Sequence, residues 1–199
     1  MAPIVTAAVE GPTDEAVAGR LITHVGAEMG PVHGKQGKPH LRQHVGGYNN
    51  AAHHAPWLVL VDLDREAGCA PPLCDAWLPA PAPGLCFRVA VRAVEAWLLA
   101  DQEALAAFLG VARKRIPGQP EVLDDPKSTM VNLARTSRRK AIREDMVPRQ
   151  GSGRSVGPAY PSRLIEFISG HWRPDVAAKR ADSLARTIRC LRRLVEAAP

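Results

Sequence analysis

The chain has 199 residues, enough for one domain with a substantial core, and no apolar run approaches the roughly 20 residues that a membrane-spanning helix needs. A membrane is therefore not an expected partner. Its four cysteines have no C-x-x-C spacing, which argues against a zinc site and predicts reduced thiols in a cytoplasmic protein.

The net charge of +6 is unevenly distributed along the chain. Residues 1–110 carry 7 basic and 11 acidic side chains, 7 − 11 = −4, whereas residues 111–199 carry 19 and 9, 19 − 9 = +10. An acidic first half and a basic second half indicate a cation site beside an anion-binding surface, for which nucleic acid is the obvious partner. The alternative is a solvated basic helical region.

The first predicted element is a buried strand over residues 4–9, an apolar run that ends at Glu10. A helix over residues 14–29 follows, with Thr13 as its expected N-cap. Glu10 is therefore placed at the mouth of a strand-to-helix turn. Residues 31–40 are rich in turn formers and could hold a short strand.

The strongest strand pattern is the apolar run over residues 57–61, which leads directly into Asp62 and Asp64. A continuous run of this length predicts a strand buried on both faces, as in a parallel sheet. Because residues i and i+2 of a strand point to the same side, the two aspartates are expected to project together at its carboxyl end. If this strand neighbours the first one, Glu10 joins them. Such carboxylates repel one another unless a hard cation such as Mg²⁺ lies between them; the alternative is two solvated aspartates.

A further strand over residues 85–91 passes into a helix in which Glu95 stands among apolar residues, either exposed or held inward for a purpose. The loop over residues 151–157 is glycine-rich but has no P-loop pattern. Together the elements predict an α/β domain over residues 1–110 with a small, mainly parallel sheet flanked by helices, and a basic helical extension over residues 111–199 packed on it. The other helices are expected over residues 41–45, 72–77, 101–109, 125–134, 160–172 and 177–197.

The combination of Glu10-Gly-x-Thr-Asp after one strand and Asp62-x-Asp64 after another resembles the Toprim signature. Toprim is the metal-binding module shared by topoisomerases, bacterial primases and overcoming-lysogenization-defect nucleases. The resemblance places the glutamate of the family at Glu10 and its aspartate pair at Asp62 and Asp64. It implies a Toprim-like sheet flanked by helices.

The wider pattern is similar to a compact bacterial branch known only as a domain of unknown function, related to the Toprim domains of those nucleases. The segments that carry this resemblance are residues 95–101 (EAWLLAD) and 125–127 (DPK), together with Tyr160 and Phe167. The resemblance covers nearly the whole chain. It implies action on nucleic acid, often in bacterial defence.

These observations predict a Mg²⁺- or Mn²⁺-dependent nuclease, or a related phosphoryl-transfer enzyme, that acts on DNA or RNA. Asp62 and Asp64 are expected to hold the metal, and Glu10 to act as general base, general acid or further ligand. Glu95 could complete a second metal site, and Asp101 is a weaker candidate. The residues expected to contact the phosphate backbone are Lys35, Lys38, Lys127, Arg138, Arg139 and Lys140.

Two alternatives stay open. One is a non-catalytic Toprim-like subunit that binds nucleic acid or an ATPase partner protein, with carboxylates kept for metal-dependent structure. The other is a phosphohydrolase of small nucleotides. A topoisomerase is disfavoured by the short chain, whose tyrosines are Tyr48 and Tyr160. A haloacid-dehalogenase-type phosphatase is also disfavoured, because its Asp-x-Asp follows the first strand. The oligomeric state is left open.

Overall fold

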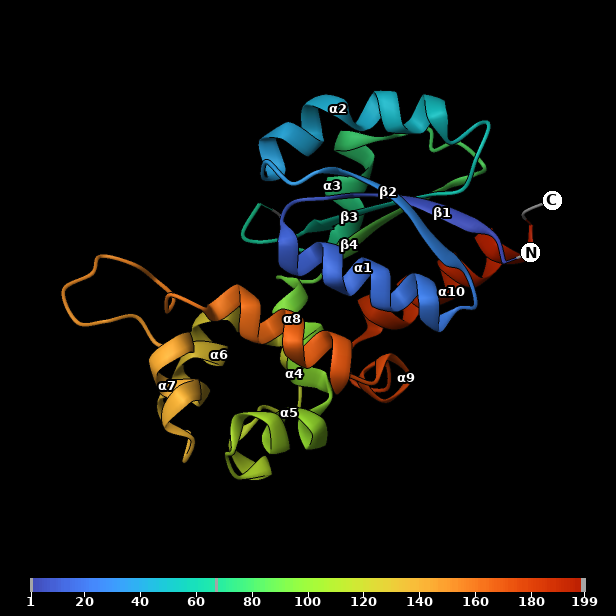
Figure 1. Cartoon of the computed structure of the whole chain (residues 1–199). Coiled ribbons are helices and arrows are strands. Elements are labelled where there is room, and N and C mark those ends of the chain that lie inside the picture. The colour runs from blue at the N-terminus through green and yellow to red at the C-terminus, as the bar shows by residue number, and fades with distance from the viewer. Residues whose placement is uncertain (1, 67, 198–199) are drawn as a thin grey trace.

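The computed structural model describes residues 2–66 and 68–197. Its centre is a four-stranded, all-parallel sheet in the order β2-β1-β3-β4, with helices on both faces (Figure 1). The predicted α/β fold with a mainly parallel sheet flanked by helices is therefore confirmed. The strands are β1 (Ile4–Val9), β2 (Glu28–Gly34), β3 (Trp57–Asp62) and β4 (Leu85–Ala90).

The alternation of side chains along β3 divides the core into two layers. Leu58 and Leu60 pack in one layer with α1 (Pro12–His24), and Val59 and Val61 pack in the other. This alternation confirms a strand buried on both faces, as its unbroken apolar run predicted. Figure 1 shows α1 and α10 on one side of the sheet and α2 on the other. The helices of the second layer are α2 (Lys38–Ala51) and α3 (Ala70–Trp77).

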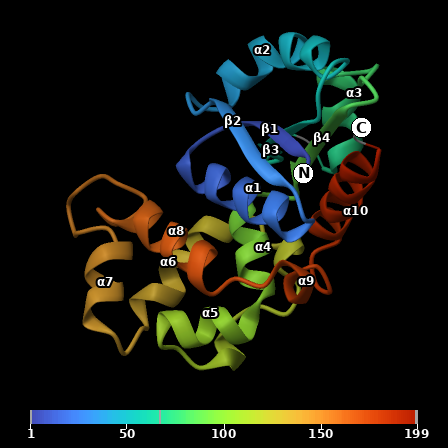
Figure 2. The ribbon, with the colours of Figure 1, turned by 45° about the vertical axis from the view of Figure 1, so that its right-hand side comes forward.

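The second half of the chain is helical, as predicted, and packs against the α1 face of the sheet. One continuous cluster of buried residues reaches from β1 to α10. Figures 1 and 2 both place α8 alongside α1. No helix in the described part of the chain is long and apolar enough to cross a membrane. The remaining helices are α4 (Val94–Ala100), α5 (Gln102–Leu109), η1 (Arg113–Arg115), η2 (Pro120–Val122), α6 (Pro126–Arg135), α7 (Lys140–Met146), α8 (Tyr160–Gly170), α9 (Pro174–Ala177) and α10 (Asp182–Glu196).

The first helix is shorter than predicted, because the expected helix over residues 14–29 is closed by a Schellman motif. Gly26 adopts the left-handed conformation at φ +84°, and its N–H donates to the Thr23 carbonyl. The Ala27 N–H donates to the Ile22 carbonyl. Both bonds satisfy carbonyls at the helix end, and the chain is turned out of the helix toward β2.

Other predicted boundaries also change. The N-cap of α1 is Gly11 rather than Thr13. Of the turn-rich stretch over residues 31–40, residues 31–34 end β2 and residues 38–40 begin α2. As an edge strand, β2 tolerates Pro31 with a shift in its register against β1. The weak helix over residues 41–45 extends to the full length of α2. The last helix, expected over residues 177–197, begins only at Asp182 as α10, after the separate short helix α9.

Two glycine substitutions test the role of the Schellman motif. Gly26→Ala places a Cβ in the left-handed region and should destabilise the protein by about 1–2 kcal/mol. Gly47→Ala is the matched control, because Gly47 lies inside α2 with open space around it and should stabilise the protein by up to about 1 kcal/mol. Urea unfolding measures both, and a Gly26→Ala protein as stable as the parent would contradict this role.

Candidate active site

The topology of the sheet places two predicted site residues side by side. β1 and β3 are neighbours, and the chain continues from β1 to β2 on one side and from β3 to β4 on the other. In open α/β sheets such a switch point leaves a crevice outside the carboxyl ends of the strands, where ligands bind. Glu10 follows β1 and Asp62 ends β3, so both lie at this crevice.

Backbone hydrogen bonds fix the two carboxylates. Glu10 Oε1 accepts a hydrogen bond from the Asp62 N–H at 2.8 Å. Asp62 Oδ1 in turn accepts one from the Val94 N–H at 2.9 Å, in the first turn of α4. The N-cap residue of α4, Ala93, has no capping side chain. Asp62 therefore caps α4 from a distant part of the chain, where the positive end of the helix favours its negative charge.

A cavity of about 250 Å³ opens beside Asp62 and is lined by Asp14, Glu95, Lys127 and Tyr160. Asp14 and Glu95 come from the first turns of α1 and α4 and are only 8% and 3% exposed. Glu95 Oε1 accepts a hydrogen bond from the Tyr160 hydroxyl at 3.3 Å and lies 3.8 Å from Lys127 Nζ. We call Asp14, Asp62 and Glu95 the carboxylate cluster.

Burial and mutual repulsion raise the pKa values of carboxyl groups around this cavity. Burial, reinforced by the charges of Glu10 and Glu95, raises the pKa of Asp14 to about 7. Burial, followed by the charges of Asp14 and Glu95, raises the pKa of Asp62 well above its ordinary value. Burial also raises the pKa of Glu10, against the hydrogen bond from Asp62. The charge of Glu95 raises the pKa of Lys127, which therefore keeps its proton.

Asp64 lies on the rim rather than in the cavity. The strand ends at Asp62, and Asp64 is left-handed at φ +52°, so the expectation based on strand alternation fails. Its carboxylate pairs with Lys38 Nζ at 3.0 Å, and the same ammonium pairs with Glu66 at 3.1 Å and donates to the Asp62 carbonyl. Although burial opposes it, the hydrogen bond from Lys38 to Asp64 raises the Lys38 pKa. Lys38 therefore braces the loop after β3.

Among the six basic residues predicted to contact phosphate, only Lys127 is found among the described residues that line the cavity. Lys35 Nζ lies 3.3 Å from the Glu15 carboxylate. Lys38 pairs with Asp64 and Glu66. The remaining three surround the start of α7 and are exposed; they are Arg138, Arg139 and Lys140.

Asp101, the weaker metal candidate, belongs to a different interaction. It is fully buried, and its carboxylate accepts hydrogen bonds from Arg173 Nη2 at 2.7 Å and Arg173 Nε at 3.0 Å. It also caps α5 through the Ala104 N–H. Asp101 therefore supports the packing of α5 and is outside the carboxylate cluster.

Asp14 and Tyr160 were not predicted as site residues. Asp14 closes the Glu10-Gly-x-Thr-Asp motif, and this spacing places it at the third position of α1, beside the strand end. Its carboxylate accepts hydrogen bonds from the backbone of Gly11 and of Asp14 itself, as an acidic residue in a capping box does. The motif spacing could thus have indicated Asp14. Tyr160 reaches the cavity only through the packing of α8, which no local pattern reveals.

The chemistry of the cluster fits Mg²⁺, because its side chains offer carboxylate oxygens, the ligands that this ion prefers. Its buried negative charges also repel one another, which a divalent cation would relieve. Across residues 2–66 and 68–197, however, no three His, Cys, Asp or Glu side chains form a ready set of metal ligands. Metal binding here therefore requires the carboxylates to turn toward a common point.

Comparison with known proteins identifies no relative of this chain: no family model, curated protein or solved structure matches it. The resemblance to Toprim domains thus stays a prediction. Because α/β sheets of this kind host many activities, function has to be argued from the site itself.

The raised pKa of Asp14 predicts a pH dependence of stability. The folded protein binds this proton more tightly than the unfolded chain, so the free energy of unfolding should fall as pH rises from the ordinary pKa of 3.8 to about 7. Asp14→Asn should make this slope shallower, with the raised pKa values of Asp62 and Glu10 accounting for what remains, and should exceed the parent in stability by on the order of 2 kcal/mol near pH 8. Urea unfolding across this range measures it. Asp75→Asn, on the exposed side of α3, should keep the slope of the parent, and the same slope in Asp14→Asn would refute the assignment.

Proposed function

We propose that this protein is a Mg²⁺- or Mn²⁺-dependent phosphoryl-transfer enzyme of the Toprim type that cleaves phosphodiester bonds in DNA or RNA. The observation that carries the proposal is the carboxylate cluster, in which acidic side chains from three separate segments share one cavity at the switch point of the sheet. Such a concentration of negative charge is costly unless a cation enters. A divalent ion and a phosphate group together would balance the charge of the site.

The residues suited to hold the ion are Asp62 and Glu95, with Asp14 beside them, and Asp64 could join if Lys38 released it. A bound divalent ion would polarise the scissile phosphate and stabilise charge on its oxygens. Glu10 is a suitable proton acceptor or donor, because its raised pKa brings it closer to neutral pH.

Lys127 and the neighbouring loop are suited to hold the phosphate backbone. The Lys127 side chain is 51% exposed at the cavity, which leaves its ammonium accessible to a phosphate oxygen. Ser155 and Val156 also line the cavity, and Val156 is shared with a neighbouring pocket that Arg149 and Arg154 line. These contacts would be electrostatic and independent of base sequence.

Cleavage assays test the proposal. Single- and double-stranded DNA and RNA, and free nucleotides, are incubated with Mg²⁺ or Mn²⁺, with metal-free buffer as the blank. We expect polynucleotide cleavage that Asp62→Asn and Glu10→Gln reduce by about 100-fold or more and that Lys127→Gln reduces by about 10-fold. Asp75→Asn should keep parental activity.

The variants must first show the circular dichroism spectrum of the parent. Cleavage unchanged in Asp62→Asn and Glu10→Gln would sink the mechanism. Turnover of free nucleotides, with no cleavage of polynucleotides, would instead assign the protein as a phosphohydrolase of small nucleotides.

A non-catalytic binding subunit is the second candidate, and the lysine contacts favour it. Lys127 beside Glu95 and Lys38 beside Asp64 already offset part of the negative charge without a metal. This candidate predicts salt-dependent binding of oligonucleotides or a stable partner protein, with no turnover of any polynucleotide.

A further inference from the structure

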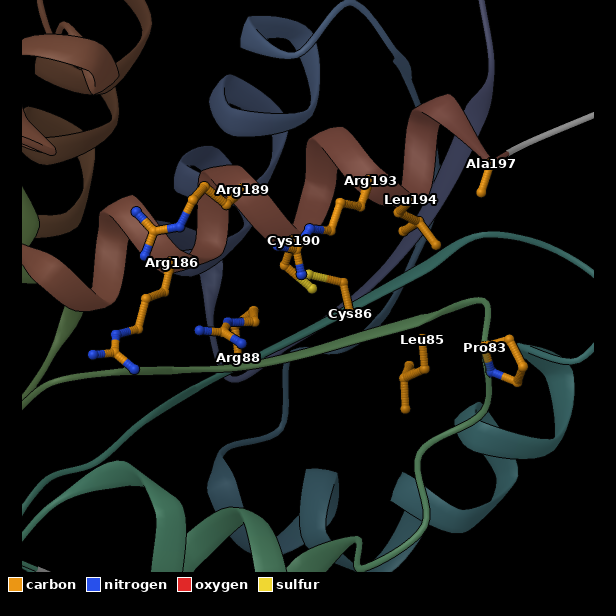
Figure 3. A pocket seen from close by; sticks show the side chains of 10 residues that line it. All are labelled: Pro83, Leu85, Cys86, Arg88, Arg186, Arg189, Cys190, Arg193, Leu194 and Ala197. Atoms are coloured by element: carbon orange, nitrogen blue, oxygen red, sulfur yellow. The ribbon is translucent and has the colours of Figure 1, made fainter.

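A second pocket, of about 600 Å³, lies between α10 and the edge strand β4 (Figure 3). Its walls include Pro83 and Leu85, so it lies near the start of β4, whereas the carboxylate cluster lies beyond the strand ends. The two sites share no lining residue. The pocket therefore needs an explanation of its own.

Four arginines line this pocket: Arg88 from β4, and Arg186, Arg189 and Arg193 from α10. The three helix residues are spaced i, i+3 and i+7, which places them along one face of α10. Figure 3 shows the Arg186 side chain extending from α10 toward β4, and those of Arg189 and Arg193 lying along the near face of the helix. No acidic residue is among the described side chains that line the pocket. We call this group the arginine pocket.

Few carboxylates balance these four charges. Arg186 pairs with Asp182 at 2.6 Å, but no ion pair to Arg88, Arg189 or Arg193 is found among residues 2–66 and 68–197. Arg88 Nε is buried without a hydrogen-bond partner in the same part of the chain. A buried N–H of a charged group is costly when unpaired, and neighbouring guanidinium groups repel one another. An anion in the pocket would relieve both costs.

Two cysteines, Cys86 and Cys190, line the pocket beside the arginines. The thiols of Cys86 and Cys190 are hydrogen-bonded, and Figure 3 shows their sulfurs close together. The hydrogen bond from Cys86, together with the charges of Arg88 and Arg193 and against burial, lowers the pKa of Cys190 to about 7. The part of this shift that comes from the arginine charges would also favour other anions in the pocket.

The opposite end of the pocket is apolar. Its lining there consists of four apolar residues: Pro83, Leu85, Leu194 and Ala197. A ligand that fills the whole pocket would therefore combine a strongly anionic group with a planar or apolar part. The volume lies in the range of sites that enclose small organic ligands, and guanidinium forks match phosphate oxygens in geometry and charge.

We propose that the arginine pocket is a binding site for the phosphate groups of a nucleotide, with the base against the apolar end. The site is distinct from the carboxylate cluster and goes beyond the proposed function. The nucleotide could be free or the end of a polynucleotide, since both present the same phosphate chemistry.

Isothermal titration of the full chain with ATP, inorganic phosphate and a 5′-phosphorylated oligonucleotide tests the proposal. We expect ATP to bind more tightly than phosphate alone, because phosphate cannot use the apolar end. The double substitution Arg189→Gln/Arg193→Gln should weaken ATP binding at least about 10-fold, since each lost charge-assisted bond is worth more than a neutral one. Arg192→Gln is the matched control: Arg192 is exposed and adjacent to Arg193 on α10 but does not line the pocket, so this variant should bind ATP as tightly as the parent does.

Thiol alkylation supplies a second readout that is independent of catalysis. ATP should slow alkylation of Cys190, followed by peptide mass spectrometry, but not that of the exposed Cys69, which lies outside the pocket. Oligonucleotide binding to the arginines with no ATP binding would assign the site to polynucleotide ends, and ATP binding alone would assign it to free nucleotides.

The proposal would be overturned if neither ATP nor the 5′-phosphorylated oligonucleotide showed saturable binding at concentrations below about 1 mM. Equal weakening by Arg192→Gln and the double substitution would also overturn it. Asp62→Asn should leave ATP binding to the arginine pocket unchanged, so failure of this proposal is distinguishable from failure of the nuclease proposal.

Discussion

Carboxylates held out of water in one cavity are the constraint on which the rest of this structure depends. Each buried negative charge costs free energy, and each further one raises that cost by repulsion. The fold offsets the cost with backbone N–H groups: Asp62 accepts one from Val94 at the start of α4, and Glu10 accepts one from Asp62 itself. Lys127 and the hydroxyl of Tyr160 complete the compensation around Glu95.

The two halves of the chain build this cavity together. The first half supplies the acidic side chains, and the second supplies Lys127, Ser155 and Tyr160. The halves are joined by hydrogen bonds around Ser183, whose hydroxyl accepts from the Trp97 indole and the Val91 N–H and donates to Glu121. The helical half is therefore part of the site rather than an independent appendage, because without it Glu95 would lose both of its partners.

The sequence predicted the parts of the site that depend on local pattern and on strand order. The unbroken apolar run of β3 indicated a central parallel strand, and a neighbouring β1 then brought Glu10 to Asp62. Two local predictions failed for backbone reasons. A positive φ at Gly26 turns the chain out of α1, and a positive φ at Asp64, two residues beyond the end of β3, breaks the expected strand alternation; the hydrophobic pattern predicts neither. Tyr160 and Lys127 were beyond local prediction as partners of Glu95, since contacts at such separations arise only from helix packing.

The uneven charge along the chain takes a different form in space. The sequence suggested an acidic domain followed by a basic one, but the fold interleaves them: basic Lys127 lies beside acidic Glu95, and Arg88, from the acidic half, faces the arginines of α10. The acidic and basic side chains are instead separated along the sheet. Carboxylates gather beyond the ends of β1 and β3, and arginines gather beside β4. A parallel sheet directs all its carboxyl ends to one edge, so acidic residues that follow strands converge there whatever their distance in the chain.

Arg88 could be assigned to the basic group only once β4 was known to be an edge strand covered by α10. Charge counted along a sequence thus indicates which kinds of ligand to expect, whereas the order of the strands decides where each kind can bind.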